Sequence, residues 1–408
     1  MRFLVSHPFG RRGDRTDGAR TVRDGSKMGE SEFLDRFSQE RLGVRKSRIS
    51  PCNSNPRNIL SGEWDTAVLS ARENSVKKTL AVVGLLIFAL VDLSAQKLTG
   101  AGATFPYPIY SKWFSEYAAA HPGIEINYQS IGSGGGIRQV TAGLVDFGAS
   151  DMPMADDALA ASKVKLIHIP TVLGAVVPVF NVPGVSNIRF SGGVLANIYL
   201  GKISMWNDGQ IAKDNPGVQL PAQKIIVVHR SDGSGTSFIF TDYLSKVSSE
   251  WGNGPGRGTS PSWPAGVGGK GNEGVAGLVR QLPGAIGYVE LIYALQNKIA
   301  FGAVQNPAGA WVTASIGGVT EAAAGIKQMP ADYRISITNA PGKDAYPISS
   351  FTYLLIPVHA ADAAKGKVIK DLLSWIVNSG ESEAPGLSYA PLPQSVAAKV
   401  LKTVYSLQ

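Results

Sequence analysis

The hydrophobic and polar positions after residue 95 repeat the order strand, glycine-rich turn, helix three times. Strands are expected where apolar residues alternate with polar ones or form a short run, and helices where apolar residues recur every three to four positions. Each expected strand ends at a cluster of Gly, Ser and Thr, and a helical pattern follows directly. The three units cover residues 98–121, 124–144 and 224–246.

Strands that alternate with helices indicate an α/β protein with mostly parallel sheets. Ligands of such proteins bind outside the carboxyl ends of the strands, which places the interest in the three turns. Residues 175–180 and 353–357 are expected to be buried strands, and the apolar spacing over 368–376 predicts a late amphipathic helix. The segment 252–274, rich in Gly, Pro and Trp, is expected to be a loop.

An export signal is predicted at 76–95. Lys77 and Lys78 precede an apolar run over 81–91, and small residues up to Ala95 form a cleavage site. The alternative is a membrane anchor, but eleven apolar residues fall short of the ~20 that span a bilayer. Residues 1–75 are interpreted as an annotation error upstream of the true start, with a disordered basic extension as the alternative.

Charge and cysteine content exclude several classes of protein. The chain has a net charge of +8, but residues 96–408 hold 23 basic and 20 acidic residues and no dense basic run, which argues against nucleic-acid binding. The single cysteine, Cys52, lies before the signal, so the mature part forms no disulfide and no thiolate metal site. Its four histidines lack ligand spacing, and neither a metal nor a cofactor is expected.

The three turns have the composition of an anion site. Each places hydroxyl side chains beside glycines at the start of an expected helix, where unpaired N–H groups and the helix dipole favour negative charge. One such turn is more often only a helix cap, whereas three in one chain can converge on a single ion. The hydroxyl groups concerned are those of Thr104, Ser133, Ser234 and Thr236.

Two charged positions refine the type of anion. Arg230 ends the third strand, where its guanidinium could hold an oxyanion with Asp232 as its partner, although an ordinary strand-end ion pair is the alternative. Asp151 should repel an anion unless the ligand brings a proton, and hydrogen phosphate does. Sulfate has no proton at neutral pH and would face Asp151 at a cost of about 1 to 3 kcal/mol.

Several segments resemble the signature segments of the periplasmic phosphate-binding proteins of Pst transport systems. The resemblance spans about 97–405 in order, and its segments are 100–106, 131–136, 146–151, 199–208, 230–236 and 282–290. By that resemblance the phosphate-binding residues are Thr104, Phe105, Ser133, Asp151, Arg230, Ser234, Gly235 and Thr236, with Asp232 supporting Arg230. Gly134 stands where relatives often have serine, which leaves a hydrogen bond from that side chain unsupported.

The resemblance also implies a two-lobed periplasmic-binding-protein fold with the ligand in the cleft. Residues 96–172 and 343–408 are expected in lobe 1 and 173–342 in lobe 2. A hinge closing on the ion, a soluble monomer in the periplasm, and docking on the permease of an ABC importer with its ATPase are further expectations.

Two other functions remain open at this point. One is a receptor for another tetrahedral oxyanion, sulfate or molybdate, against which Asp151 is the main argument. The other is a phosphoryl-handling enzyme, but the chain has no nucleophile elbow around Ser133 or Ser234 and no complete P-loop near Lys270. We therefore expect a binding protein and not an enzyme.

Overall fold

The computed structural model describes residues 96–407. The expected signal at 76–95 and the segment 1–75 lie outside the described residues. Within 96–407 no helix combines the length and the apolar character needed to cross a membrane. One large hydrophobic core cluster runs through this part of the chain, and a small second cluster surrounds Val140 and Leu355.

Most strands belong to one nine-stranded sheet in the described part of the chain. These strands are β1 Gln96–Gly102, β2 Ile124–Ser130, β3 Phe147–Ser150, β4 Leu166–Asn181, β6 Ile226–Arg230, β7 Val267–Gly269, β8 Ala285–Glu290, β9 Ala300–Phe301 and β12 Ser349–Pro357. Their order is β2-β1-β3-β12-β4-β8-β6-β7, and β9 pairs with β4. Beside them, β5 Arg189–Phe190, β10 Ala303–Gln305 and β11 Trp311–Val312 form a three-stranded sheet.

The strand directions are mixed. The strands β1, β2 and β3 are parallel, and β6 is parallel to β7 and β8. β12 and β4 are antiparallel to each other, and they pair antiparallel with β3 and β8 respectively. The expectation of mostly parallel sheets therefore holds for the strands that lead into the three turns and is wrong for the centre of the sheet.

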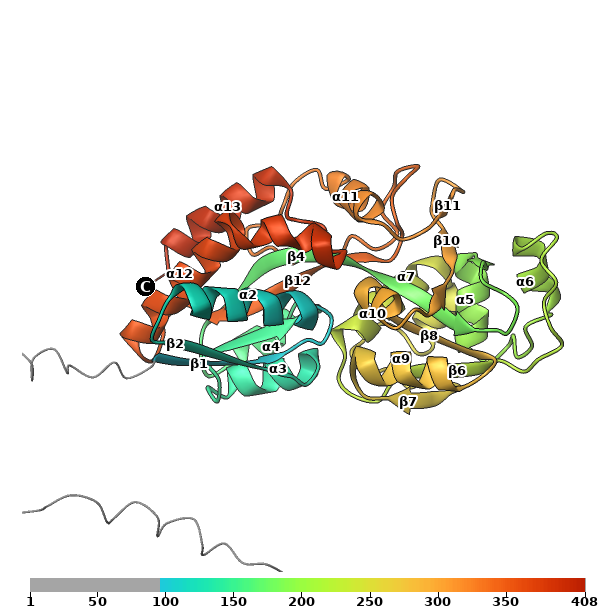
Figure 1. The fold of residues 1–408 in the computed structure, drawn as a ribbon, viewed down its shortest axis with the longest axis horizontal. Helices are drawn as coiled ribbons and strands as arrows, with labels where there is room; N and C mark the ends of the chain where they lie inside the picture. Colours follow the sequence, from blue (N-terminus) through green and yellow to red (C-terminus); the bar gives the residue numbers. More distant parts are fainter. Residues whose placement is uncertain (1–95, 408) are drawn as a thin grey trace, which may run out of the picture. The chain divides into compact units, whose positions relative to one another are not determined.

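Strand β4 belongs to both ends of the large sheet. Residues 166–175 pair with β12, and the continuation over 176–181 pairs with β8. In Figure 1, β4 accordingly runs from the side of β1 to the side of β8. We call the part around β1, β2 and β3 lobe 1, and the part around β6, β7 and β8 lobe 2. The expected boundary after residue 172 falls inside β4 and stays a prediction.

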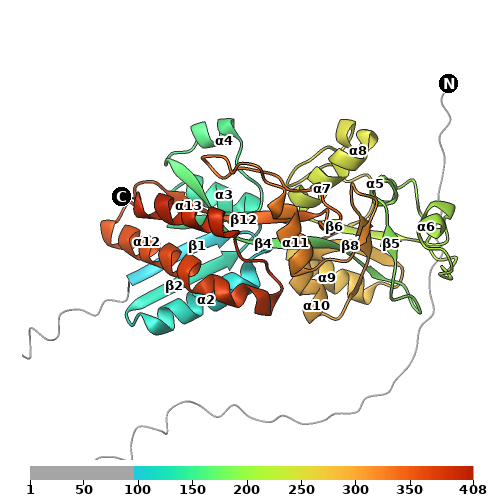
Figure 2. The same ribbon diagram turned by 90° about the horizontal axis from the view of Figure 1, so that it is seen from above.

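Helices cover the strands of both lobes. The helices are α2 Tyr107–Ala120, α3 Ser133–Thr141, α4 Asp156–Ala160, α5 Gly192–Tyr199, α6 Gly209–Asp214, α7 Gly235–Val247, α8 Ser249–Asn253, α9 Gly271–Gln281, α10 Leu291–Gln296, α11 Ile316–Ala324, α12 Ala363–Asn378, the 3-10 helix η1 Gly380–Leu387 and α13 Gln394–Tyr405. Figure 2 shows α12 and α13 beside α2, so the end of the chain returns to lobe 1.

The three predicted strand-turn-helix units are present as β1–α2, β2–α3 and β6–α7. The helix α3 begins at Ser133, four residues before the expected start, so the Gly-rich segment is its first turn rather than a separate loop. The expected strands at 175–180 and 353–357 fall in β4 and β12, and the late helix falls in α12.

The expectation of a continuous loop over 252–274 is wrong. This segment contains the short strand β7, which pairs with β6, and the start of α9. The sequence Val267-Gly268-Gly269 carries only one apolar side chain, so its three residues give no recognisable strand pattern. Strand β7 forms because its backbone pairs with the edge of β6 that does not pair with β8. The correction matters because α9 begins next to the turns after β1 and β6.

Candidate functional site

The turns after β1, β2 and β6 each bring a hydroxyl group into the interior. Thr104 follows β1, Ser133 is the first residue of α3, and Ser234 and Thr236 lie at the start of α7. All four side chains are buried. Ser234 also caps α7, because its Oγ accepts a hydrogen bond from the Ser237 N–H at 3.0 Å. Its role as a cap and its place in the site are compatible, since a hydroxyl both accepts and donates.

The first turn of α7 lies directly against the residues from lobe 1. A Cβ atom on Gly235 would overlap Ser133 Oγ and Asp151 Oδ2, so no other residue type fits at this position. The Gly134 N–H donates to the carbonyl oxygen of Gly233 across the same junction at 2.9 Å. Two of the predicted turns therefore meet at one place, with Asp151 between them.

At the end of β6 the buried Arg230 forms an ion pair with the half-buried Asp232. The guanidinium donates from Nε to Asp232 Oδ1 at 2.8 Å and from Nη2 to Oδ2 at 2.6 Å. Its remaining terminal nitrogen, Nη1, lies 3.3 Å from Thr236 Oγ1. Burial raises the pKa of Asp232, but the hydrogen bonds and charge of Arg230 outweigh it, and the pKa lies below its ordinary value. The Asp232 carboxyl group therefore stays ionised at neutral pH.

Asp151 is the contrasting carboxyl group. It is only 1% exposed, and its Oδ1 accepts a hydrogen bond from Thr352 Oγ1 at 2.8 Å. Its Oδ2 has no hydrogen-bond partner among the described residues. Burial raises the pKa of Asp151 to about 7, although Thr352, the Arg230 charge and Ser133 act in the opposite direction. A buried carboxyl oxygen without a partner, beside the starts of α3 and α7, is a position that a ligand could complete.

The backbone of Thr104 and Phe105 is held from behind by tyrosines. Tyr293 donates its hydroxyl hydrogen to the Thr104 carbonyl at 2.6 Å, and Tyr389 donates to the Phe105 carbonyl at 2.6 Å. Because both carbonyls are engaged, this turn is fixed with its carbonyls facing away from the site. The structure thus gathers the predicted residues of the three turns, Arg230 and Asp151 in one buried region.

Two residues near this region were missed by the sequence analysis. Thr352 reaches Asp151 from β12, which the sequence gives no reason to place beside β3. Asn272, on the second position of α9, donates from Nδ2 to Thr104 Oγ1 at 2.7 Å and to Thr236 Oγ1 at 3.1 Å. The signal that could have found Asn272 is another Gly-rich turn at a strand end, at Gly269 to Gly271.

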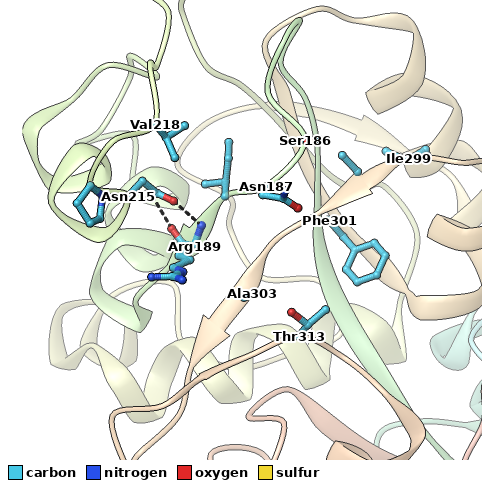
Figure 3. Close-up of a pocket in the computed structure, with 12 residues that line it drawn as sticks. Ser186, Asn187, Arg189, Asn215, Val218, Ile299, Phe301, Ala303 and Thr313 are labelled. Atoms are coloured by element: carbon cyan, nitrogen blue, oxygen red, sulfur yellow. Dashed lines mark hydrogen bonds between the residues drawn. The ribbon is translucent and has the colours of Figure 1, made fainter.

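A separate pocket of about 530 Å³ lies in lobe 2 and contains none of the predicted ligand residues. Figure 3 shows Arg189, Asn215 and Thr313 among its lining side chains. The polar groups of Asn215 are satisfied by the Arg189 backbone, so nothing there resembles the unpartnered oxygen of Asp151. Within residues 96–407 no cluster of three or more His, Cys, Asp and Glu side chains is arranged to hold a metal.

Comparison with known proteins decides the family. Residues 89–379 match the PBP superfamily domain. A phosphate-binding protein PstS of Xylella fastidiosa is 49% identical over 307 residues, which cover 74% of this chain and 84% of the relative. The chain belongs to the PstS family. A PstS protein of Pasteurella multocida is 46% identical over 316 residues, with 77% of this chain and 91% of the relative covered. These names describe binding proteins, in agreement with the expectation that the chain is not an enzyme.

Solved structures confirm the fold. The phosphate-binding protein of Stenotrophomonas maltophilia aligns with a TM-score of 0.56 at 19% identity, over 76% of this chain and 94% of that protein. A high-affinity periplasmic phosphate-binding protein, solved with bound phosphate, aligns with a TM-score of 0.61 at 22% identity, over 75% of this chain and 93% of that one. The predicted α/β periplasmic-binding-protein fold is therefore confirmed for this member of the PstS family.

Proposed function

We propose that this chain binds one inorganic phosphate ion between lobes 1 and 2 and delivers it to an ABC-type importer. The proposed ligand residues are Thr104, Phe105, Ser133, Asp151, Arg230, Ser234, Gly235 and Thr236, with Asp232 holding Arg230. The proposal joins the membership of the PstS family to the burial and convergence of these residues. The ion undergoes no chemical change in this function.

The observation that carries the choice of ligand is the unpartnered Oδ2 of Asp151. Most groups around it are hydrogen-bond donors, namely hydroxyls, a guanidinium and the N–H groups at helix starts. A carboxylate among donors accepts only a ligand that offers a proton itself. Monohydrogen and dihydrogen phosphate do so, whereas sulfate would place two acceptors against each other in a dry site.

The remaining residues supply complementary roles. Arg230 contributes a fixed positive charge, and Asp232 keeps its guanidinium oriented. The starts of α3 and α7 contribute N–H groups and the positive ends of two helix dipoles. These groups are already in position, so little side-chain entropy is lost when the ion binds.

Contacts between the lobes support a closed form around the ligand. Gly134 meets Gly233, and Asn272 reaches Thr104, each across the junction. In the proposed cycle the lobes open to admit phosphate, close on it, and present the closed form to the membrane permease, whose ATPase drives import. Export to the periplasm and a monomeric state belong to the same proposal.

Calorimetric titration of the purified protein with phosphate, arsenate and sulfate tests the function. At pH 8 we expect tight binding of phosphate and arsenate and at least about 100-fold weaker binding of sulfate. The difference in affinity between phosphate and sulfate should become smaller at pH 5, because a protonated Asp151 then donates a hydrogen bond to sulfate. Equal affinity for sulfate at pH 8, or no heat with phosphate, would overturn the proposal. Binding of molybdate in place of phosphate would indicate a different oxyanion receptor.

A further inference from the structure

The strongest unassigned feature of the described residues is the hydrogen-bonding position of Asn272. Its side chain is fully buried and lies between a hydroxyl of lobe 1 and a hydroxyl of lobe 2. Its Oδ1 accepts the backbone N–H of Glu290 at 3.0 Å. Because a backbone N–H can only donate, this contact fixes the orientation of the amide, and Nδ2 must face the two threonines.

The two hydroxyl groups then have no acceptor capacity left. A threonine hydroxyl has one hydrogen and two lone pairs. Thr104 Oγ1 accepts from Asn272 Nδ2 at 2.7 Å and from the Asn272 backbone N–H at 3.3 Å. Thr236 Oγ1 accepts from Asn272 Nδ2 at 3.1 Å and from Arg230 Nη1 at 3.3 Å. Each hydroxyl is left with a single hydrogen to donate.

Neither hydrogen finds an acceptor within residues 96–407. No hydrogen bond is present in which Thr104 Oγ1 or Thr236 Oγ1 is the donor to another protein atom. Threonines inside helices commonly donate to the carbonyl four residues earlier, as Thr241 does to Ser237. Thr236 lies on the second residue of α7, where no such helical carbonyl precedes it. Both hydrogens are therefore free for a ligand.

We propose that Asn272 is a positioning residue that fixes Thr104 and Thr236 as hydrogen-bond donors and so sets the site to accept an oxyanion. This inference rests on the proposed function and goes beyond it, because it names a residue that selects the ligand class without touching the ion. A free hydroxyl could turn and accept from a donor ligand. The amide of Asn272 prevents that rotation by occupying the lone pairs.

The same contacts tie this donor pattern to closure. Thr104 belongs to lobe 1, whereas Asn272 and Thr236 belong to lobe 2. The contact from Asn272 to Thr104 therefore exists only when the lobes are together, and the Thr104 hydroxyl becomes an obligate donor at that moment. Asn272 thus completes the site in the closed form.

The test exchanges the amide for a carboxyl group of the same shape. Asn272→Asp presents an acceptor to both hydroxyls, which then turn their hydrogens away from the ion. We expect phosphate affinity at pH 8 to fall about 100-fold or more. Asn272→Ala only releases the two hydroxyls, and it should lower the phosphate affinity by about 10-fold. Asn306→Asp is the matched control, because Asn306 is also buried and donates to three carbonyls, but none of its hydrogen-bond partners is a proposed ligand residue.

The pH dependence separates positioning from simple damage. A buried carboxyl group beside an anion has a raised pKa, so the carboxylate that Asn272→Asp introduces regains a proton as the pH falls. The affinity ratio of wild type to Asn272→Asp should therefore shrink by about 10-fold from pH 8 to pH 5. The ratio for Asn272→Ala should stay constant, since alanine does not titrate. A constant ratio for both variants would overturn the inference.

A coupling measurement keeps the inference testable if Asn272→Asp does not fold. Asn272→Ala and Thr236→Val are compared singly and together, with thermal unfolding as the check on the fold. If Asn272 acts through Thr236, the combined loss of affinity is smaller than the product of the single losses. Independent, multiplicative losses would overturn it. Wild-type protein that does not bind phosphate would instead refute the proposed function itself.

Discussion

The turns after β3 and β6 each contain an aspartate, the buried Asp151 and the half-buried Asp232, and the pKa values of the two carboxyl groups are shifted in opposite directions. Asp232, after β6, has both oxygens on Arg230, and its pKa lies below the ordinary value. Asp151, after β3, has one oxygen on Thr352 and one without a partner among the described residues, and burial raises its pKa to about 7. The same residue type thus serves two purposes, set by the neighbours alone.

The comparison separates attraction from selection in the proposed site. The turn of lobe 2 has its charges paired before a ligand arrives, so its guanidinium is oriented but not exposed to water. The turn of lobe 1 leaves one carboxyl oxygen open, and this oxygen tests the ligand for a proton. The turn of lobe 2, with Arg230, should govern how tightly any oxyanion binds. The turn of lobe 1, with Asp151, should govern which oxyanion binds.

Removing the arginine should have the largest effect. Arg230→Ala deletes the only side-chain cation in contact with Asp232 among the described residues and leaves that half-buried carboxylate without its ion-pair partner. We expect phosphate and arsenate affinity to fall about 100- to 1,000-fold by calorimetry, because the ion loses a charge-assisted hydrogen-bonding partner and faces an Asp232 carboxylate that is no longer neutralised. Arg230→Lys retains the charge without the fork and serves as the comparison. An Arg230→Ala protein with near-normal affinity would contradict the assigned role.

Neutralising Asp151 should change the preference for phosphate over sulfate more than it changes the affinity for phosphate. Asp151→Asn replaces an acceptor by an amide that can donate to sulfate, so the preference for phosphate over sulfate should fall about 10- to 100-fold at pH 8. Thr352→Val is a useful companion, since it removes the contact of the other carboxyl oxygen and keeps the titrating group. An unchanged preference in Asp151→Asn would remove Asp151 from the selection step.

The smallest expected effect is on the stability of the unliganded protein. Because the folded-state pKa of Asp151 lies above its ordinary value of 3.8, its stabilising contribution is present at low pH and lost as the pH rises through about 7. Between pH 5 and pH 8 the melting temperature of wild type should fall by about 2 to 4 °C more than that of Asp151→Asn. If the lobes open in the unliganded protein, water reaches Asp151, and the difference in melting temperature becomes smaller. Parallel profiles would mean that Asp151 is hydrated before binding.

The sequence was sufficient to locate the three turns of the site. Strand β2, for example, alternates in burial along its length, and its pattern identifies the strand and the turn that follows. Hydroxyl and glycine residues at the starts of helices have few structural roles besides capping and anion contact, so Thr104, Ser133 and Ser234 could be singled out.

The residues that sequence reasoning missed depend on contacts between distant segments. Thr352 lies 201 positions from Asp151, and only the antiparallel pairing of β12 with β3 brings it there. Asn272 lies 168 positions from Thr104. It follows a three-residue strand with two glycines, which has no recognisable strand pattern. No local pattern encodes such pairings, because they follow from the packing of whole sheets.

Strand β4 has a further consequence for how the protein folds. Its first ten residues are hydrogen-bonded to β12 and its last six to β8, so one uninterrupted peptide segment is an integral part of both lobes. A cut after residue 172 would divide the ladder between β4 and β12 and separate β1, β2 and β3 from β12, whereas residues 176–181 would stay paired with β8 in the second fragment. Neither fragment would be self-sufficient, and denaturant should melt residues 96–408 in one cooperative transition.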